Sequence, residues 1–378
     1  QKVGAIEAQN RGFDTVVSPA MGLPLNSTAC AMCGQCTVVC PTGALKETDG
    51  LAPVWRALAD PEKRVVVQVA PAVRAALGEE FGLPVGTPVT GKMATALHEI
   101  GFDDVFDTLF SADLTILEEG TELLGRLNAA LKGDESQKEK AVLPMITSCS
   151  PGWIKHIEHQ FPEELDHLST CKSPHTMLGA VVKSFYAERT GTAPENMFVV
   201  SVMPCTAKKY EIQRPEMEVD GNRDVDAVLT TRELARMIKT AGIDFVNLPE
   251  GEFDAPLGLG TGAADIFGVT GGVMEAALRT VYEVVTGKEL PFDKLHVAPI
   301  VGLEQVKTAS ITIEDTLPAY EHLKGVTVNV AVTSGLEGAS MLMKEVANGT
   351  SPYHFIEVMG CPGGCINGGG QPRCSEEN

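Results

Sequence analysis

Four segments of the chain concentrate thiols, and their spacing points to metal-bound sulfur. Eight of the ten cysteines lie in these segments, which cover residues 30–41, 147–151, 203–205 and 361–370. The first segment holds four cysteines close together, whereas the other three are spread over more than two hundred residues. Thiols so far apart in sequence can meet only in a folded cleft. Thiolate is the usual protein ligand of iron in iron–sulfur clusters.

The first segment has the spacing of a ferredoxin cluster motif. Cys30, Cys33 and Cys36 follow one another with two residues between them. Cys40 comes next, with Pro41 directly behind it. In the bacterial ferredoxin pattern three such thiolates hold one cubane, and the fourth serves the other cluster of a two-cluster unit. A zinc site normally uses two separated cysteine pairs. The segment therefore predicts a 4Fe–4S cluster at these four cysteines.

A two-cluster unit requires a second motif upstream, and the residues before Cys30 contain none. We therefore expect that the chain has lost an N-terminal part, or that Cys40 or a non-protein ligand completes the cluster. The chain begins at Gln1 without a methionine, which is typical of a fragment or a processed product.

Composition argues against several classes of protein. The formal charge of −20 argues against nucleic acid and anionic membranes as partners. No apolar run approaches the roughly 20 residues of a membrane helix. The N-terminus shows no signal-peptide pattern, so we expect a cytoplasmic protein with no membrane span. Disulfide frameworks are typical of small secreted scaffolds, a class that a chain of 378 residues does not fit.

Alternating strands and helices beyond residue 53 predict an α/β fold. Runs of apolar, largely β-branched residues read as buried strands, and a capping box at Thr230 and Glu233 predicts a helix over 231–240. This alternation implies buried sheets flanked by helices. Residues 1–53 form a separate small unit around the first cysteine segment. The predicted strands cover residues 65–69, 197–202, 326–332 and 355–358.

The other thiols follow predicted strands. Cys205 comes after the strand that ends at Met203, and Cys361 comes after the strand that ends near Met359. Cys149 follows an apolar run and precedes a predicted helix. Ligands of α/β proteins bind beyond the carboxyl ends of the strands. We therefore expect these thiols to converge on one crevice.

Two further polar patterns read as structural. His156 and His159 could face one side of a helix as metal ligands, but no third ligand is in view, so we interpret them as a solvated helix face. The charged residues 132–140 read as a solvated loop.

Three of the cysteine segments together resemble a known family. Residues 147–153, 203–211 and 357–372 look like the three signature motifs of iron-only hydrogenases, in that family's order. The likeness extends from about residue 1 to residue 372, which is nearly the whole chain. It implies a two-lobed domain that holds the H-cluster, with lobes over about 54–200 and 201–378, behind a partial ferredoxin-like domain.

The resemblance implies a composite iron centre and its ligands. The H-cluster of this family is a cubane joined through one cysteine to a two-iron unit that carries CO, cyanide and a bridging dithiolate. Cys205, Cys361 and Cys365 match cubane ligands, and Cys365 matches the bridge. The fourth ligand position is Ser150, where the family usually has cysteine. Three arrangements remain open there: Ser150 binds iron, Cys149 takes the ligand role, or the iron keeps an open or water-bound position.

The resemblance also implies roles around the cluster. Cys149 matches the thiol that passes protons to the bridging group, and Lys208 matches the residue that holds a cyanide. His175 stands where many members carry an amide. From the residues alone, Glu118, Glu119 and Glu122 would read as a solvated acidic turn. The positions that match the onward proton relay are Glu119, Ser169 and Glu122, and those that match the lining of the pocket are Pro71, Ser173, Met203, Phe267 and Met359.

The function that the resemblance implies is the reversible interconversion of H2 with protons and electrons. The cluster at residues 30–40 would carry electrons between the H-cluster and a ferredoxin or an electron-transfer partner subunit. Two alternatives are a hydrogen-sensing relative with little turnover and a non-catalytic, hydrogenase-like iron–sulfur assembly protein. The presence of Cys149, Lys208, Met203 and Met359 favours catalysis.

Overall fold

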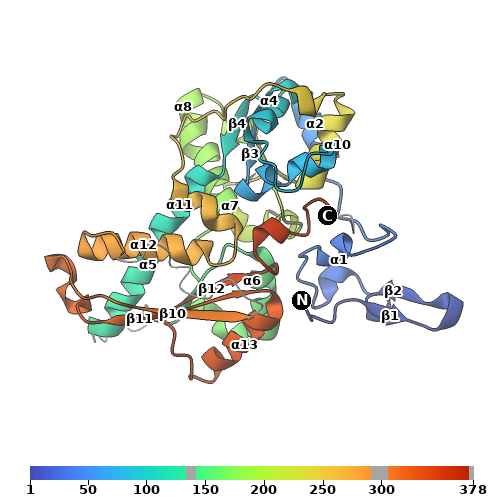
Figure 1. Cartoon of the computed structure of the whole chain (residues 1–378). Coiled ribbons are helices and arrows are strands. Elements are labelled where there is room, and N and C mark those ends of the chain that lie inside the picture. Colours follow the sequence, from blue (N-terminus) through green and yellow to red (C-terminus); the bar gives the residue numbers. More distant parts are fainter. Residues whose placement is uncertain (133–141, 291–304, 374–378) are drawn as a thin grey trace. The chain divides into compact units, whose positions relative to one another are not determined.

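The fold is taken from a computed structural model that describes residues 1–132, 142–290 and 305–373. The chain forms two units, each assembled from three separate segments, and Figure 1 follows the segments by colour. The units do not coincide with the predicted lobes of residues 54–200 and 201–378. The domain bounds 1–53 and 54–378 remain a prediction. Unit 1 comprises Gln1–Cys33, Glu119–Thr170 and Ala277–Gly363, and unit 2 comprises Gly34–Glu118, Cys171–Ala276 and Gly364–Asn378.

Unit 2 is built on a parallel sheet of four strands in the order β4-β3-β6-β9. The strands are β3 (Arg64–Val69), β4 (Asp104–Asp107), β6 (Met197–Met203) and β9 (Ala227–Thr230). Helices cover a parallel sheet on both faces, so its strands carry nearly continuous apolar runs. This confirms the predicted strands at 65–69 and 197–202.

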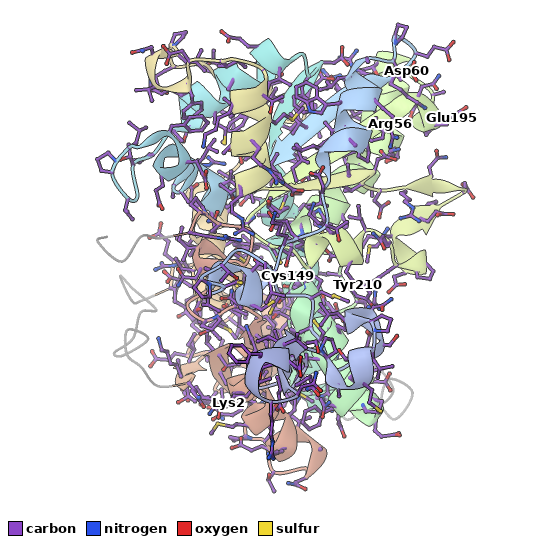
Figure 2. The ribbon with its side chains drawn as sticks, turned by 90° about the vertical axis from the view of Figure 1, so that its right-hand side faces the viewer. Lys2, Arg56, Asp60, Cys149, Glu195 and Tyr210 are labelled. Atoms are coloured by element: carbon purple, nitrogen blue, oxygen red, sulfur yellow. The ribbon has the colours of Figure 1, made fainter. Side chains whose placement is uncertain are left out.

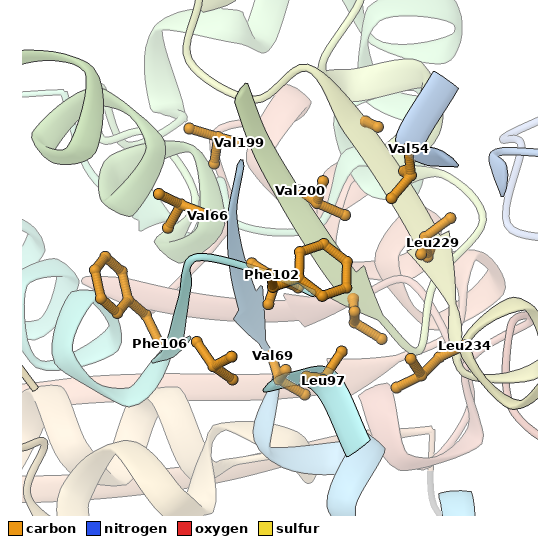
Figure 3. Packing of buried hydrophobic residues seen from close by; sticks show 14 of the residues in the cluster. Val54, Val66, Val69, Leu97, Phe102, Phe106, Val199, Val200, Leu229 and Leu234 are labelled. Carbon is orange, nitrogen blue, oxygen red and sulfur yellow. The ribbon is translucent and has the colours of Figure 1, made fainter. Parts of the chain in front are cut away.

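The core of unit 2 packs helices against this sheet. Figure 3 shows Val66, Val69, Val199 and Val200 of the strands among side chains such as Leu97 of α4 (Thr90–Ile100). Each fully buried Val or Leu contributes roughly 1.5–3 kcal/mol relative to an exposed one. The other helices that contribute to this core are α2 (Leu51–Leu58), α7 (Pro174–Val181) and α10 (Thr231–Thr240).

Helix α10 begins and ends where the sequence predicts. The Thr230 side chain accepts a hydrogen bond from the backbone N–H of Glu233, and the Glu233 carboxylate accepts one from the backbone N–H of Thr230. This reciprocal cap satisfies two donors that a helix start otherwise leaves unpaired. Gly242, at φ +74°, follows the helix and ends it.

Unit 1 contains a mixed sheet of four strands in the order β10-β11-β12-β5. β10 (Val306–Thr312) pairs antiparallel with β11 (Thr327–Ser334), whereas β12 (Phe355–Met359) and β5 (Met145–Ile146) continue the sheet in parallel. α6 (Pro151–Gln160) and α13 (Leu336–Ala347) supply Trp153, Ile157 and Leu342 to the core of this unit. The predicted strands at 326–332 and 355–358 are confirmed.

The interpretation of the two histidines as a solvated face is wrong for one of them. His156 is buried, and its Nε2 lies 2.8 Å from the Ser340 hydroxyl of α13. His159 is exposed. His159 lies about one turn further along, next to Gln160, the last residue of α6.

The remaining elements are short or connect the parts already described. Residues 133–140 of the predicted charged loop lie outside the described residues. Among the described helices, none is both long enough and apolar enough to cross a bilayer. The further strands are β1 (Glu7–Gln9), β2 (Val16–Ser18), β7 (Glu218–Val219) and β8 (Asn222–Arg223), and the further helices are α1 (Gln35–Val38), α3 (Pro71–Arg74), α5 (Leu109–Lys132), α8 (Ala187–Thr190), α9 (Lys208–Glu211), α11 (Gly262–Asp265) and α12 (Gly272–Thr286).

Candidate metal centre

The predicted cluster ligands lie just beyond the ends of strands. Cys205 follows β6 in unit 2, and Cys361 follows β12 in unit 1. Cys149 and Ser150 join β5 to α6 in unit 1, and Cys149 is labelled in Figure 2. Cys365 begins a short 3-10 turn, Cys365–Asn367, in unit 2. Each unit therefore carries part of the predicted ligand set, and the meeting of all these residues remains a prediction.

In unit 1, the segment that carries Ser150 is hydrogen-bonded to the end of β12. Thr147 Oγ1 accepts a hydrogen bond from the Val358 N–H at 3.1 Å, and Ser150 Oγ accepts one from the Gly360 N–H at 3.0 Å. A Cβ at Gly360 would lie 2.6 Å from Ser150 Oγ, so this approach requires glycine. Ser150 and Cys361 therefore sit on two closely packed stretches of backbone.

In unit 2, glycines bring the loop of Cys365 against the loop of Cys205. The Gly370 N–H donates to the Pro204 carbonyl at 2.8 Å, and a Cβ at Gly368 would collide with that same carbonyl. Gly364 has φ +102°, and a Cβ there would lie 2.7 Å from the Thr270 nitrogen. Such close backbone packing is open only to glycine. The two cysteine-bearing loops and their glycines fit a bulky cofactor that is bound through sulfur.

Lys208 belongs to a buried ionic cluster in unit 2. Its Nζ lies 2.8 Å from Glu211 Oε2, and His175 Nε2 lies 2.6 Å from the same oxygen. Burial lowers the pKa of His175, and the Lys208 charge acts in the same direction, so the imidazole is neutral. Burial alone would raise the pKa of Glu211, but Lys208 and His175 bring it to about 2. His175 Nε2 thus donates to Glu211, and Nδ1, 3.1 Å from Ser201 Oγ, accepts from that hydroxyl.

Removal of the Glu211 charge is expected to destabilise unit 2. Glu211→Gln leaves the Lys208 ammonium, whose side chain is 12% exposed, without its counter-charge. Breaking a buried pair in this way costs about 3 kcal/mol. The control is Glu216→Gln, because Glu216 pairs with Arg214 but its side chain is 50% exposed, and such pairs contribute at most about 1 kcal/mol. Denaturant unfolding of both variants compares the two losses, and equal losses would contradict the structural role of Glu211.

The predicted relay residues form a hydrogen-bonded chain in unit 1. Glu119 and Glu122 lie on α5, so the acidic-turn interpretation is wrong, and Glu119 is only 1% exposed. Ser169 Oγ donates to Glu122 Oε2 at 2.9 Å and is also hydrogen-bonded to Glu119. The Ser148 backbone N–H hydrogen-bonds Glu119, which places this carboxyl against the segment of Cys149. A proton can therefore pass along carboxyl, hydroxyl and carboxylate groups.

The sequence analysis missed Arg126, which fixes the outer end of this chain. Its guanidinium lies 2.7 Å from Glu122 Oε1 and also donates to the backbone carbonyls of Val142, Asp166 and Leu168. The four-residue spacing from Glu122 to Arg126 on a helix is a recognisable signal for such a pair. Glu211 was missed as well, although it lies three residues after Lys208 on the same short helix.

Glu119 is expected to titrate near neutral pH. Burial raises its pKa from 4.5 to about 7, and the negative charges of Glu122 and Glu357 act in the same direction. Between these two pH values the folded chain binds more protons than the unfolded chain, so Glu119 opposes folding increasingly as the pH rises. Infrared difference spectra should show a protonated carboxyl band that disappears as the pH rises through about 7. The band should be absent in Glu119→Gln.

The control for this titration is the neighbouring Glu118→Gln, because Glu118 is exposed on the same helix. It should leave the band unchanged. A carboxyl band that persists in Glu119→Gln, or one that titrates near the ordinary 4.5 in the natural chain, would contradict the assignment.

The predicted pocket-lining residues flank these ligands in their own units. Pro71 follows β3 and Met203 ends β6, so they lie at the carboxyl ends of adjacent strands. Ser173 precedes α7 and is buried, and Phe267 is buried on the turn after α11. These four residues belong to unit 2, whereas Met359 ends β12 in unit 1. Their contact with a cofactor remains a prediction.

The first cysteine segment lies against these motifs in both units. In unit 1, a Cβ at Gly152 would lie 3.2 Å from the Ala31 carbonyl and 3.8 Å from the Cys33 Cβ. In unit 2, a Cβ at Gly34 would collide with Thr206, the neighbour of Cys205. Gln35 Nε2 also donates to the Asn367 carbonyl at 2.8 Å. Residues 31 and 33 therefore adjoin the segment of Ser150 within unit 1, and residues 34 and 35 adjoin the segments of Cys205 and Cys365 within unit 2.

The thiols of this loop differ in their surroundings. Cys30, Cys33, Cys36 and Cys40 are all half-buried. Hydrogen bonds from the Leu45 backbone and the Thr42 side chain lower the pKa of Cys40 to about 7. Within the part of the chain that the structure describes, no three His, Cys, Asp or Glu side chains converge on a single-ion position.

The α/β sheets, the thiols beyond their strands and the buried, hydrogen-bonded carboxyl groups fit an iron–sulfur protein. Residues 63–369 match the family described as iron only hydrogenase large subunit, C-terminal domain, and residues 23–46 match the 4Fe-4S binding domain. The chain belongs to the iron-only hydrogenase large-subunit family. These matches confirm the fold class, and they confirm the cofactors expected from the sequence, a 4Fe–4S cluster and the H-cluster.

Individual relatives agree with this family. The chain is 54% identical to the NADP-reducing hydrogenase subunit HndD of Solidesulfovibrio fructosivorans over 98% of its own length and 61% of that protein. It is 50% identical to the Periplasmic [Fe] hydrogenase large subunit of Nitratidesulfovibrio vulgaris, with 84% and 71% of the two chains covered. Its fold matches the FeFe-hydrogenase HydA1 of Chlamydomonas reinhardtii with a TM-score of 0.75 and 44% identity, over 86% and 85% of the chains.

The assembly proteins considered as an alternative are more distant. The Cytosolic iron-sulfur assembly component 3 of Pongo abelii is 33% identical over 82% of this chain and 62% of that protein. The chain spans about three fifths of the length of HndD.

Proposed function

We propose that the chain catalyses the reversible interconversion of H2 with protons and electrons. The observation that carries this proposal is the hydrogen-bonded chain of Glu119, Ser169 and Glu122 beside the segment of Cys149. A buried chain of titratable groups suits proton transfer in a catalytic reaction, which a protein that only holds cubanes does not carry out. The relatives named as hydrogenases are also more similar to this chain than the assembly protein of Pongo abelii is.

Different residues of the chain would serve cofactor binding, proton transfer and electron transfer in this reaction. The H-cluster, when bound, supplies the iron at which H2 is split or formed. Cys205, Cys361 and Cys365 would hold its cubane, with Ser150 at the fourth position. Lys208, oriented by Glu211, offers a fixed positive charge to an anionic cyanide, a charge-assisted interaction that a buried site strengthens.

Proton transfer would use the carboxyl groups of α5 together with Cys149 and Ser169. Cys149 would hold the proton that passes between the bound cofactor and Glu119. The buried Glu119 Oε1 makes no hydrogen bond within the described residues, which leaves it open to exchange such a proton. Ser169 and Glu122 carry the proton onward, and Arg126 holds Glu122 in place. The pKa of about 7 keeps Glu119 ready to take up or release a proton near neutral pH.

Cys30, Cys33, Cys36 and Cys40 would hold the cluster that supplies electron transfer to the cofactor. The contacts from Ala31 to Gly152 and from Gln35 to Asn367 support this path, because they join the cluster loop to the ligand segments. The partner is a ferredoxin or an electron-transfer subunit, and the name of HndD as a subunit of an NADP-reducing enzyme supports the latter. A cytoplasmic location is our prediction, and one relative is named as periplasmic.

A hydrogen assay tests this function. The full chain, loaded with both cofactors, is assayed for H2 uptake with an oxidised viologen and for H2 evolution with the reduced dye. We expect turnover in both directions. A fully loaded chain that turns over in neither direction would contradict the enzyme and favour an assembly role, whereas slow turnover with normal H2 binding would favour a sensor.

A further inference from the structure

Ser150 occupies a position where its family has cysteine, and its surroundings in unit 1 suit a ligand. Ser150 precedes α6 at the N-cap position, yet its side chain makes no capping hydrogen bond. Serine at this position normally caps the helix. Instead Ser150 Oγ accepts the N–H of Gly360, one residue before Cys361. The hydroxyl is therefore held beside a predicted cubane ligand, away from the helix that it would otherwise cap.

The backbone argues against an exchange of roles with Cys149. Ser150 has extended backbone angles, φ −103° and ψ 102°. In extended backbone, successive side chains point to opposite sides. Because Ser150 Oγ faces Gly360, we expect the Cys149 side chain to point to the other side. Glu119 lies beside Ser148, so the relay thiol keeps its place in the proton path.

We propose that Ser150 Oγ is the fourth protein ligand of the cubane, bound as an alkoxide. This inference rests on the proposed function only in that it requires the H-cluster cubane. As the Fe–O bond forms, the hydroxyl proton leaves to solvent and no electron is transferred; metal ligands release protons in this way. The Gly360 N–H then donates a charge-assisted hydrogen bond to the negative oxygen.

An oxygen ligand makes one iron of the cubane easier to remove than the others. Alkoxide is a harder ligand than thiolate, and iron in sulfide-bridged clusters prefers soft sulfur. Loss of this iron as Fe²⁺ from a doubly positive 4Fe–4S cubane leaves a neutral 3Fe–4S cluster, so charge and electrons balance. The chain is thus expected to hold a cubane with one distinct and labile iron.

Iron release from the full chain tests the proposal without any measurement of turnover. The natural chain, Ser150→Cys and Ser150→Ala are loaded with ⁵⁷Fe and sulfide, without the two-iron unit, and exposed to a ferrous chelator under anaerobic conditions. Mutation of residues that only hydrogen-bond to a metal's ligands typically alters metal affinity by about 10–100-fold, so a change of the ligand itself should have at least as large an effect. We expect the labile iron to leave Ser150→Ala at least about tenfold faster than the natural chain, and to leave Ser150→Cys at least about tenfold more slowly.

Mössbauer spectra of the same samples report the ligand directly. One iron with distinct parameters should appear in the natural chain, convert to an ordinary cubane signal in Ser150→Cys, and change again in Ser150→Ala. The matched control is Ser340→Ala, which removes another hydroxyl of unit 1 that bonds His156, and it should behave as the natural chain does. Identical release and spectra for the natural chain and Ser150→Ala would overturn the proposal, whether or not the enzyme turns over H2.

Discussion

Cys365→Ala is expected to abolish hydrogen turnover. Cys365 begins the turn that the glycines of unit 2 pack against Pro204, and by resemblance its sulfur joins the cubane to the two-iron unit. An alanine side chain cannot bridge two metal centres, so the loss should exceed about 10³-fold, the range of effects seen when a group central to the chemistry is removed. H2 evolution from reduced viologen measures it after the variant and the natural chain are loaded in parallel.

The matched control is Cys171→Ala, which removes a half-buried thiol of unit 2 outside the cysteine motifs. This control should retain turnover close to that of the natural chain. Iron analysis of Cys365→Ala should show the accessory cluster at Cys30 to Cys40 still present, because its ligands are untouched. Turnover retained by Cys365→Ala would refute the bridging role.

Cys149→Ala is expected to keep the cubane but to slow proton exchange severely. The thiol belongs to the segment whose Ser148 N–H binds Glu119, at the inner end of the predicted proton path. Positioned proton donors contribute about 10²–10⁴-fold, so the rate of H2/D2O isotope exchange should fall by that range. Iron content and the cubane spectrum should match those of the natural chain.

Cys149→Ser separates proton transfer from ligation in this experiment, since a hydroxyl keeps a transferable proton but is far less acidic than a thiol. We expect it to retain more exchange than alanine while both variants keep their iron. If Cys149→Ala lost the cubane iron instead, Cys149 would be a ligand, and the assignment of Ser150 as the ligand would fall with it.

Sequence patterns located the elements well where the signal is local. The β-branched run at Val65–Val69 has few other ways to fold than a buried strand, and the cap of Thr230 and Glu233 fixes the start of α10. The places of Cys205 and Cys361, each just beyond the carboxyl end of its own strand, follow from the predicted strands, β6 and β12.

What the sequence could not predict depends on distant contacts. The burial of Glu119 arises because Ser169 and the segment after β5 pack onto α5, and no property of the acidic run itself signals this. His156 was misjudged for the same reason, since Ser340 of α13 lies far away in sequence. Units assembled from three segments each likewise cannot be predicted from local patterns, because their segments lie far apart in sequence.

The measurement that tests this account most directly is the infrared spectrum of the chain after maturation with the two-iron unit. The account requires Cys205, Cys361 and Cys365 to hold one composite centre, and CO and cyanide absorb where protein does not. We predict intrinsic CO and cyanide bands in the natural chain that are lost in Cys365→Ala. A fully matured chain with cubane spectra but no such bands would contradict it.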